Sequence, residues 1–294
     1  MTSFITLRHY DDNRLGSHIQ FFLNQIFYAY HHRYWIQYDM NHLKYTSSVF
    51  VEILLRFIDK YNSTLSGIIP EKEEHILLDL DYSQQMYRTL KSIHTDFLSF
   101  WREIYPGNVS EDIWKMAPPN YTENIPFDPK KTIAVHLRLD DVHDWWDYDG
   151  RISADYYQVR IQKDTNIQEM QHVHNYGWCP NIQSPIPYDR IQVQIDAAKQ
   201  RFPDHEVVII SSPSTRDLIR VPYRVLCNTD ESYDLFLLSI ADVVILGRSH
   251  FSISAILFGN HSHIYAPLWG QFVLYGFSTK YDRSNDTGLC SYFW

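Results

Sequence analysis

Histidine, arginine and two aspartates follow one short apolar run within residues 132–141, TIAVHLRLDD. The run is rich in β-favouring residues, which is typical of a strand buried on both faces. The polar side chains at its end are His136, Arg138, Asp140 and Asp141. In open α/β sheets, ligands bind beyond the carboxyl ends of the strands, so these side chains mark a candidate site. The alternative is a strand end that carries a solvated salt bridge.

Two more clusters of small or charged residues follow predicted strands, ISSPS at 210–214 and GRSHFS at 247–252. Because the carboxyl ends of parallel strands share one edge, we expect all three clusters to converge there. The step into RSHFSISA predicts a helix that begins near Ser249 or Ser252, where unpaired backbone N–H groups attract phosphate oxygens. An ordinary serine N-cap is the alternative. The chain contains neither G-x-G-x-x-G nor a P-loop sequence, so neither of those nucleotide sites is supported.

The second half of the chain alternates between strand and helix patterns, as a parallel sheet covered by helices on both faces requires. Strands are expected at 132–139, 206–212, 224–228, 243–247 and 261–267, and helices at 188–202, 233–241 and 249–259.

The first half predicts a helix from Gly16 that runs into a short strand, YWIQY, at 34–38. Further helices are expected at 43–60 and 82–104, with a strand at 76–81 between them. The segment 117–131, APPNYTENIPFDPKK, is rich in Pro and Asn and has no periodicity, which predicts a linker.

The composition is that of a folded globular protein of 294 residues, enough for two modest domains or one large one. A formal net charge of -9 argues against nucleic acid as a partner, because binding phosphates requires clustered Lys and Arg. Three widely spaced cysteines fit a reducing compartment better than a disulfide framework. No run of 18 apolar residues and no signal peptide is recognised, so we expect a soluble cytoplasmic protein without membrane insertion.

Three motifs, in the correct order along the chain, resemble the fucosyltransferase-like superfamily of GT-B glycosyltransferases. The stretch RLGSHIQFFLNQIFYAY is similar to its N-terminal G-x-G-N-[QR] loop and helix, with Gly16 at the second glycine and Ser17 in place of asparagine. AVHLRLDD is similar to its H-x-R motif through His136 and Arg138. ESYDLFLLSIADVVILGRSHFSISA is similar to its last motif, a helix led by an aspartate, then a strand and a Ser-x-Phe-Ser turn.

The resemblance implies a role for each matched residue. Arg138 would hold the β-phosphate of a nucleotide sugar and stabilise the leaving diphosphate. This role suits the guanidinium group, because it is always charged and can donate two parallel hydrogen bonds to phosphate oxygens. His136 would lie against the ribose or base, and Asp234 would accept hydrogen bonds from the base. The remaining donor-binding residues would be Gly16, Ser249, His250, Phe251 and Ser252. The second arginine that often follows H-x-R is Leu139 here.

The resemblance also implies the fold and the reaction. The fold would be α/β of the GT-B type, with two Rossmann-like domains facing a cleft. Residues 1–130 would form the acceptor side, 131–275 the nucleotide-sugar domain, and 276–294 a segment that packs back toward the first domain. The enzyme would transfer one sugar with inversion to a glycan acceptor, without metal or cofactor. GDP-L-fucose is the first choice of donor, followed by UDP-xylose or another UDP-sugar. Because the sequence shows no membrane anchor, we expect a soluble enzyme of bacterial or viral origin.

The general base is expected in the loop HYDDNRLGSH, between the first strand and the first helix. We choose Asp12, with Asp39 at the end of the second strand as the alternative. Two other functions remain open. A metal-dependent GT-A enzyme would use Asp79 and Asp81 of the D-x-D sequence ILLDLD, because paired carboxylates suit a hard divalent cation. A non-catalytic sugar-binding protein would need an aromatic surface but no phosphate-binding arginine.

Overall fold

The computed structural model describes residues 4–7, 14–65, 105, 107–139, 188–247, 249–267 and 290–293. Its largest element is a six-stranded sheet with the strand order β5-β4-β3-β6-β7-β8. Every pair of neighbouring strands in this sheet is parallel. The strands are β3 (Thr132–His136), β4 (Glu206–Ile210), β5 (Arg224–Leu226), β6 (Val243–Ile245), β7 (His263–Pro267) and β8 (Cys290–Phe293). The predicted α/β class with a parallel sheet is therefore confirmed.

The strand order reverses between β3 and β6. From β3 the chain moves outward through β4 to β5, and it then returns to the other side of β3 for β6, β7 and β8. A reversal of this kind opens a crevice at the carboxyl ends of the two central strands, where α/β proteins bind ligands. The H-x-R motif at the end of β3 and the Ser-x-Phe-Ser turn after β6 flank this point.

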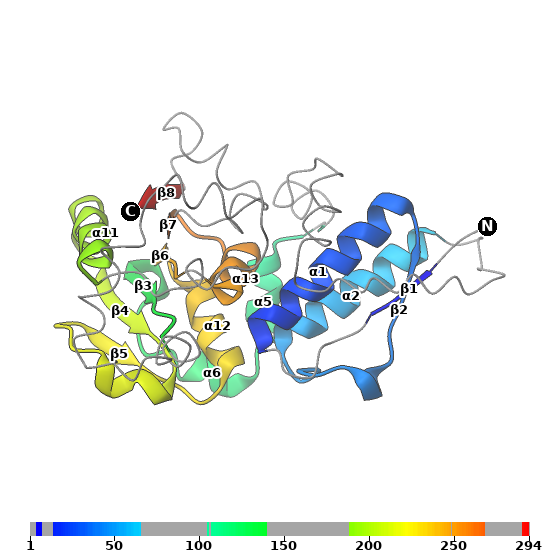
Figure 1. Ribbon diagram of the computed structural model, residues 1–294, viewed down its shortest axis with the longest axis horizontal. Helices are drawn as coiled ribbons and strands as arrows, with labels where there is room; N and C mark the ends of the chain where they lie inside the picture. The colour runs from blue at the N-terminus through cyan, green and yellow to red at the C-terminus, as the bar shows by residue number, and fades with distance from the viewer. Residues whose placement is uncertain are drawn as a thin grey trace, which may run out of the picture.

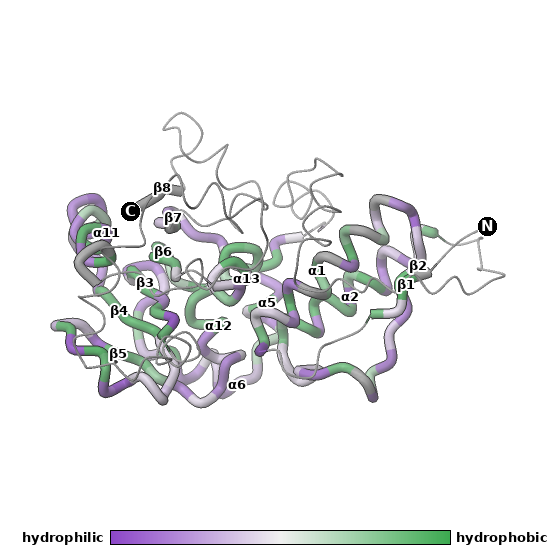
Figure 2. The backbone as a smooth tube through the Cα atoms, in the orientation of Figure 1, coloured by the Kyte–Doolittle hydropathy of each residue, from purple (hydrophilic) through white to green (hydrophobic). Residues whose placement is uncertain are grey.

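Helices cover both faces of the sheet, as the alternating strand side chains require (Figure 1). On one face, Ile133 and Val135 pack with Ile191 and Ile195 of α11 (Tyr188–Arg201). On the other face, alternate strand residues such as Ala134 pack against α12 (Glu231–Ile240) and α13 (His250–Phe258). Figure 2 shows α12 and α13 as largely hydrophobic and α11 as mixed. This difference fits the packing, because α12 and α13 contact other helices as well as the sheet.

The N-terminal part adds a second, smaller parallel pair of strands, β1 (Phe4–Thr6) and β2 (Trp35–Gln37). Its helices are α1 (Leu15–His32), α2 (Val49–Thr64), α5 (Val109–Met116) and α6 (Pro119–Glu123), with short 3-10 turns η1 (Met40–His42) and η2 (Pro129–Lys131). One hydrophobic core includes side chains of α1, α2, α5, α12 and α13, and the Phe50 and Phe258 rings lie 5.1 Å apart. Packing therefore continues across the expected boundary at 130/131, and two domains facing a cleft remain a prediction.

The structure differs from the sequence prediction in three segments. The helix expected at 43–60 begins only at Val49, because Tyr45 has a φ of 58°, which a right-handed helix cannot include. The expected linker 117–131 contains α6 and η2 and buries Tyr121 and Phe127 in the core. Residues 290–293 form β8 beside β7, a strand that the sequence did not predict, and the packing of 276–294 toward the N-terminal part stays a prediction.

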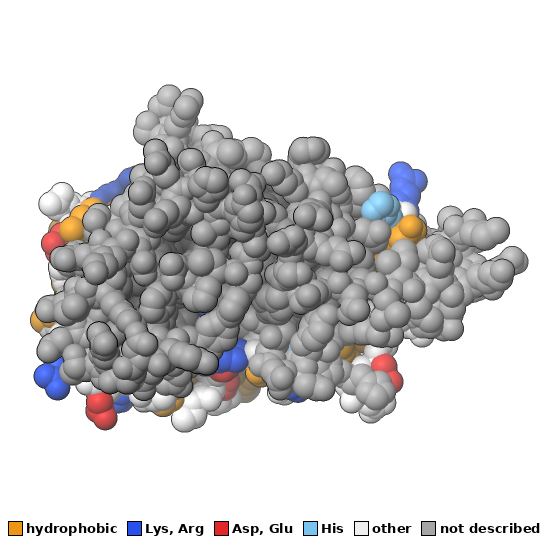
Figure 3. Space-filling model, viewed as in Figure 1, with side chains coloured by type: hydrophobic (Ala, Val, Ile, Leu, Met, Phe, Trp, Pro, Cys, Tyr) orange, Lys and Arg blue, Asp and Glu red, His pale blue; other side chains and the backbone are white. Residues whose placement is uncertain are grey.

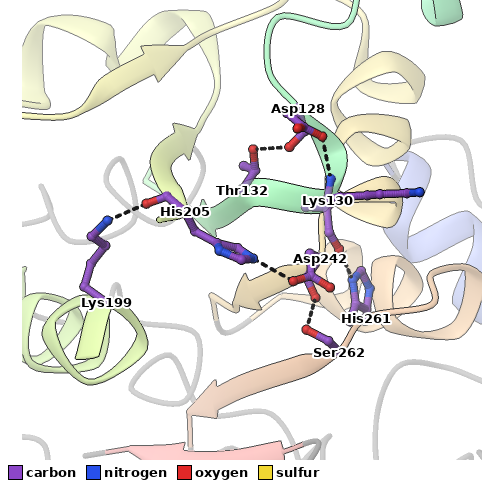
Figure 4. Close-up of polar contacts among 9 residues, drawn as sticks. Asp128, Lys130, Thr132, Lys199, His205, Asp242, His261 and Ser262 are labelled. Carbon is purple, nitrogen blue, oxygen red and sulfur yellow. Dashed lines mark hydrogen bonds and ion pairs between the residues drawn. The ribbon is translucent and has the colours of Figure 1, made fainter. Parts of the chain in front are cut away.

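The amino edge of the sheet is held together by polar contacts that lie opposite the candidate site (Figure 4). His205, before β4, contacts the Asp242 carboxylate through Nε2 at 2.7 Å. The Asp242 backbone joins η2 and β7, since its N–H donates to Pro129 and its carbonyl accepts from the Ser262 N–H. The nearby His261 ring fills the space beside Gly259, where a Cβ would lie 2.2 Å from Nε2. These contacts fix the amino ends of the strands. The candidate functional residues lie at the opposite, carboxyl edge of the sheet.

In the view of Figure 3, the described side chains are visible mainly at the margins of the molecule. Acidic and basic groups alternate along the lower edge of the molecule in the view of Figure 3 and do not gather into one patch there. Among the described helices, none is long and apolar enough to cross a membrane.

Candidate functional site

The loops after β3, β4 and β6 meet at the carboxyl edge of the sheet, as the three sequence clusters predict. The Ser211 hydroxyl donates to the Leu137 carbonyl at 2.8 Å, which ties the loop after β4 to the loop after β3. After β6, Gly247 lies so close to β3 that a Cβ placed on it would be 3.0 Å from the His136 carbonyl oxygen. The site therefore lies where the strand order reverses.

His136 and the first turn of α13 form one unit. The His136 Nδ1 and the Ser252 Oγ are 2.6 Å apart, and the His136 ring lies 5.2 Å from the ring of Phe251. His136 and Ser252 are both buried, with 8% and 0% of their surface exposed. Because the hydrogen bond fixes one ring nitrogen, it sets the orientation of the imidazole at the strand end.

The start of α13 is capped by Ser249, whose Oγ accepts a hydrogen bond from the Phe251 N–H at 3.1 Å. Ser249 and His250 are both largely buried, with 6% and 7% of their surface exposed. The cap satisfies one N–H of the first turn, while the helix dipole concentrates positive potential beside the H-x-R strand end. The serine cap proposed as the alternative is thus present, and it coexists with a setting that favours an anion.

Arg138 follows β3 by two residues and is half-buried. The Arg138 backbone nitrogen would lie 3.6 Å from a Cβ placed on Gly247. The Arg138 backbone therefore lies beside the loop that follows β6. Leu139, which replaces the second arginine of the family motif, is 4% exposed and packs in the core with α11. Arg138 is therefore the cation of this motif that lies at the carboxyl edge.

Gly16 allows α1 to touch α13 directly. A Cβ on Gly16 would lie 2.6 Å from both the Cα and the nitrogen of Phe251, closer than real Cβ atoms approach. The start of α1 is also bound to the start of α12, because Arg14 Nε and the Leu15 N–H both donate to the Glu231 carboxylate, at 2.8 and 3.1 Å. The first turns of α1, α12 and α13 therefore meet beside the carboxyl edge.

Asp234, in the first turn of α12, is buried with 7% of its surface exposed. Its carboxylate accepts a hydrogen bond from Asn228 Nδ2 at 2.5 Å. Burial raises its pKa from 3.8 to about 7, and the neighbouring Asp230 and Glu231 charges add to the rise, while the Asn228 bond and Arg14 oppose it. Near neutral pH the side chain is therefore divided between its charged and neutral forms.

Of the two candidate bases, only Asp39 lies in the described part of the chain. Asp39 is exposed and accepts hydrogen bonds from the backbone and side chain of Asn41, at 2.9 and 3.0 Å, so it caps η1. Asp12 lies outside the described residues, as do Asp79 and Asp81 of the D-x-D alternative. Within the described ranges, no group of three His, Cys, Asp or Glu side chains is arranged to hold a metal ion.

Sequence reasoning missed three residues at this site. Arg14 and Glu231 are 217 positions apart, and nothing in the sequence pairs them. Asn228 was detectable in principle, because it stands two residues past β5 and so shares the edge with the other strand ends.

No protein-family model matches the chain, and no curated protein matches it either. A search of solved structures finds the crystal structure of POFUT1 in complex with GDP, with 14% sequence identity. The match covers 87% of this chain and 94% of that chain, with a TM-score of 0.38. At this identity and TM-score, the likeness establishes neither a family nor an activity for the chain.

Proposed function

We propose that the chain is a glycosyltransferase that moves a sugar from a nucleotide sugar to a glycan acceptor, with inversion and without a metal ion. The observation that carries the proposal is the hydrogen bond between His136 and Ser252, which joins the end of β3, two residues before Arg138, to the first turn of α13 at the reversal of strand order. An arginine and a helix start together suit a diphosphate, because both offer N–H donors and positive potential. A sugar-binding protein without catalysis needs neither.

Arg138 is the residue proposed to stabilise the leaving nucleoside diphosphate. When the bond between sugar and phosphate breaks, charge builds on the β-phosphate, and a preorganised guanidinium lowers the free energy of that state. The N–H groups at the start of α13 would share this charge. His136, held by Ser252, would flank the nucleoside.

Asp234 is the residue proposed to bind the base. Guanine presents its N1–H and its amino group along one edge, and a carboxylate can accept both. Asn228 orients the Asp234 carboxylate through its own hydrogen bond. This match supports a guanine nucleotide, and the family resemblance makes GDP-L-fucose the first donor to test, ahead of UDP-sugars.

The general base remains proposed as Asp12, which would take the proton of the acceptor hydroxyl on the side opposite the diphosphate. Asp39 is the weaker choice, because its carboxylate already caps η1. The test compares Asp12→Asn and Asp39→Asn at saturating donor. Loss of turnover with intact donor binding identifies the base, and full turnover in Asp12→Asn refutes the choice.

The proposed function is tested by thermal unfolding with GDP, UDP or dTDP, each measured once in excess EDTA and once with added manganese. A nucleotide at 100 times its Kd stabilises the folded state by about 2.7 kcal/mol, so a bound nucleotide raises the Tm. We expect GDP to raise it most. A Tm that no nucleotide changes would contradict a donor site. A rise with UDP alone would move the donor to UDP-sugars, and a rise that requires manganese would favour the metal-dependent alternative.

A further inference from the structure

A pocket of about 450 Å³ lies between α6 and the turn that connects β5 to α12. Asn120 and Asn124 line one side, while Asn228, Thr229 and Tyr233 line the other. Its volume falls in the range of about 300–1,000 Å³ that is usual for small-molecule sites. No motif or role considered above uses this pocket, although Asn228 connects it to Asp234.

The walls of the pocket are held in place by hydrogen bonds between its two sides. The Tyr121 hydroxyl donates to the Asp230 carboxylate at 2.5 Å, and the Tyr233 hydroxyl donates to the Asn124 carbonyl at 2.6 Å. The two tyrosine rings lie 5.0 Å apart. These bonds join residues 109 positions apart in the sequence, so the pocket is formed before any ligand enters.

The carboxylates around the pocket disfavour an anion, although the Arg216 charge also acts on Cys227 in the pocket lining. Asp230, Glu231 and Asp234 cluster at the start of α12, and the first two disfavour ionisation of the third. An anion would meet the same repulsion. The Asp230 oxygens accept bonds from the Tyr121 hydroxyl and from the Ser232 and Tyr233 N–H groups, which leaves one of about four lone-pair positions for a cation. The pocket therefore suits a neutral ligand.

The pocket is lined by side chains of the types that commonly bind sugars. Three carboxamides, Asn120, Asn124 and Asn228, can each donate to and accept from hydroxyl groups, and Thr229 adds a hydroxyl. Among the described residues, no hydrogen bond occupies the Thr229 hydroxyl or the Asn228 Oδ1. Tyr233 contributes an aromatic ring, whose apolar face suits the C–H surface of a pyranose.

We infer that this pocket binds one neutral saccharide unit, at a second site beside the nucleotide site, and that Asn228 couples the two sites. A sugar hydroxyl that donates to Asn228 Oδ1 shifts the carboxamide whose Nδ2 donates to Asp234, and a change at Asp234 alters how a base is held there. By thermodynamic reciprocity, the nucleotide then changes saccharide affinity by the same factor. The coupling rests on the role proposed for Asp234, whereas saccharide binding does not.

Saccharide binding is tested without nucleotide, by saturation-transfer difference NMR with the methyl glycosides of fucose, galactose and N-acetylglucosamine. We expect signal from at least one probe with the wild-type protein. Thr229→Trp and Asn120→Trp fill the pocket from opposite walls at exposed positions, so each should reduce that signal at least fivefold. Thr64→Trp, on the exposed end of α2, is the matched control and should retain it. No signal from any probe, or equal signal in all variants, overturns the site.

Two further measurements separate this site from the nucleotide site. Arg138→Ala should retain the saccharide signal, and its loss there would assign the saccharide to the nucleotide site instead. The Kd of GDP should change at least threefold with saturating glycoside in the wild-type protein and not in Asn228→Ala. An unchanged Kd in the wild-type protein refutes the coupling. A protein that binds glycoside but not GDP would refute the proposed function and leave the pocket standing.

Discussion

Replacing Asp234 by Asn should change how protein stability depends on pH. The folded state raises the pKa of Asp234 from 3.8 to about 7, chiefly through burial. Between these values the folded protein holds a proton that the unfolded chain has released, so stability is lost as pH rises toward and through 7. Asparagine is neutral throughout and avoids this loss.

The size of the effect follows from the pKa change. Each pKa unit corresponds to about 1.4 kcal/mol, so the complete loss is about 4 kcal/mol, of which about 2–3 kcal/mol falls between pH 5 and 8.5. No large discount for solvent applies, because only 7% of Asp234 is exposed. Relative to wild type, Asp234→Asn should therefore gain about 2–3 kcal/mol over this interval.

Urea unfolding of both proteins at pH 5 and 8.5 measures this difference, and groups common to both cancel. Asp196→Asn, an exposed carboxylate on α11, is the matched control and should give a much smaller change. The Asp234 carboxylate should also make GDP bind more tightly to wild type as pH rises through about 7. The affinity of Asp234→Asn for GDP should remain weak and should not change with pH. A stability difference that does not vary with pH would refute the reasoning about burial.

Two further variants test the contacts around the site and away from it. Gly16→Ala should destabilise the protein by about 1–3 kcal/mol and weaken GDP binding, because the new Cβ would force α1 from the Phe251 backbone. Gly107→Ala, where a Cβ would meet Asp112 Oδ2 at 3.4 Å, is the control, and equal effects of the two changes on GDP binding would argue against the α1 contact. Asp242→Asn should lower the free energy of unfolding by about 1–3 kcal/mol, because it removes the carboxylate that is hydrogen-bonded to His205 Nε2. The Kd of GDP should not change. A weaker Kd in Asp242→Asn would show that the amino edge influences the site.

The sheet was predictable because its strands carry their own signal. Runs such as Ile133–Val135 and Val243–Ile245 are β-branched or small and apolar, which is typical of a strand buried on both faces. β8 carries no such run and is a strand because it pairs with β7. The start of α2 was misplaced by six residues, because the prediction did not use Ser48, which is the N-cap in the structure, or foresee the positive φ of Tyr45.

The site was predictable where its residues follow strands. His136, Arg138 and Ser249–Ser252 share an edge because parallel strands end together. The link from Leu15 and Arg14 to Glu231 was not predictable, because it joins the starts of two helices 216 or more positions apart. The raised pKa of Asp234 also depends on its burial by the assembled core rather than on neighbouring residues alone.

Hydrolysis of GDP-L-fucose, in which water takes the fucosyl group and GDP is released, tests the central claim most directly when wild type, Arg138→Ala and Arg138→Lys are compared at saturating donor. If Arg138 stabilises the leaving diphosphate, Arg138→Ala should lower the rate about 100- to 1,000-fold, which corresponds to about 2.7–4 kcal/mol. Arg138→Lys should also be slow, because an ammonium cannot replace the two-pronged guanidinium. A folded Arg138→Ala protein with a near-normal rate would contradict the account.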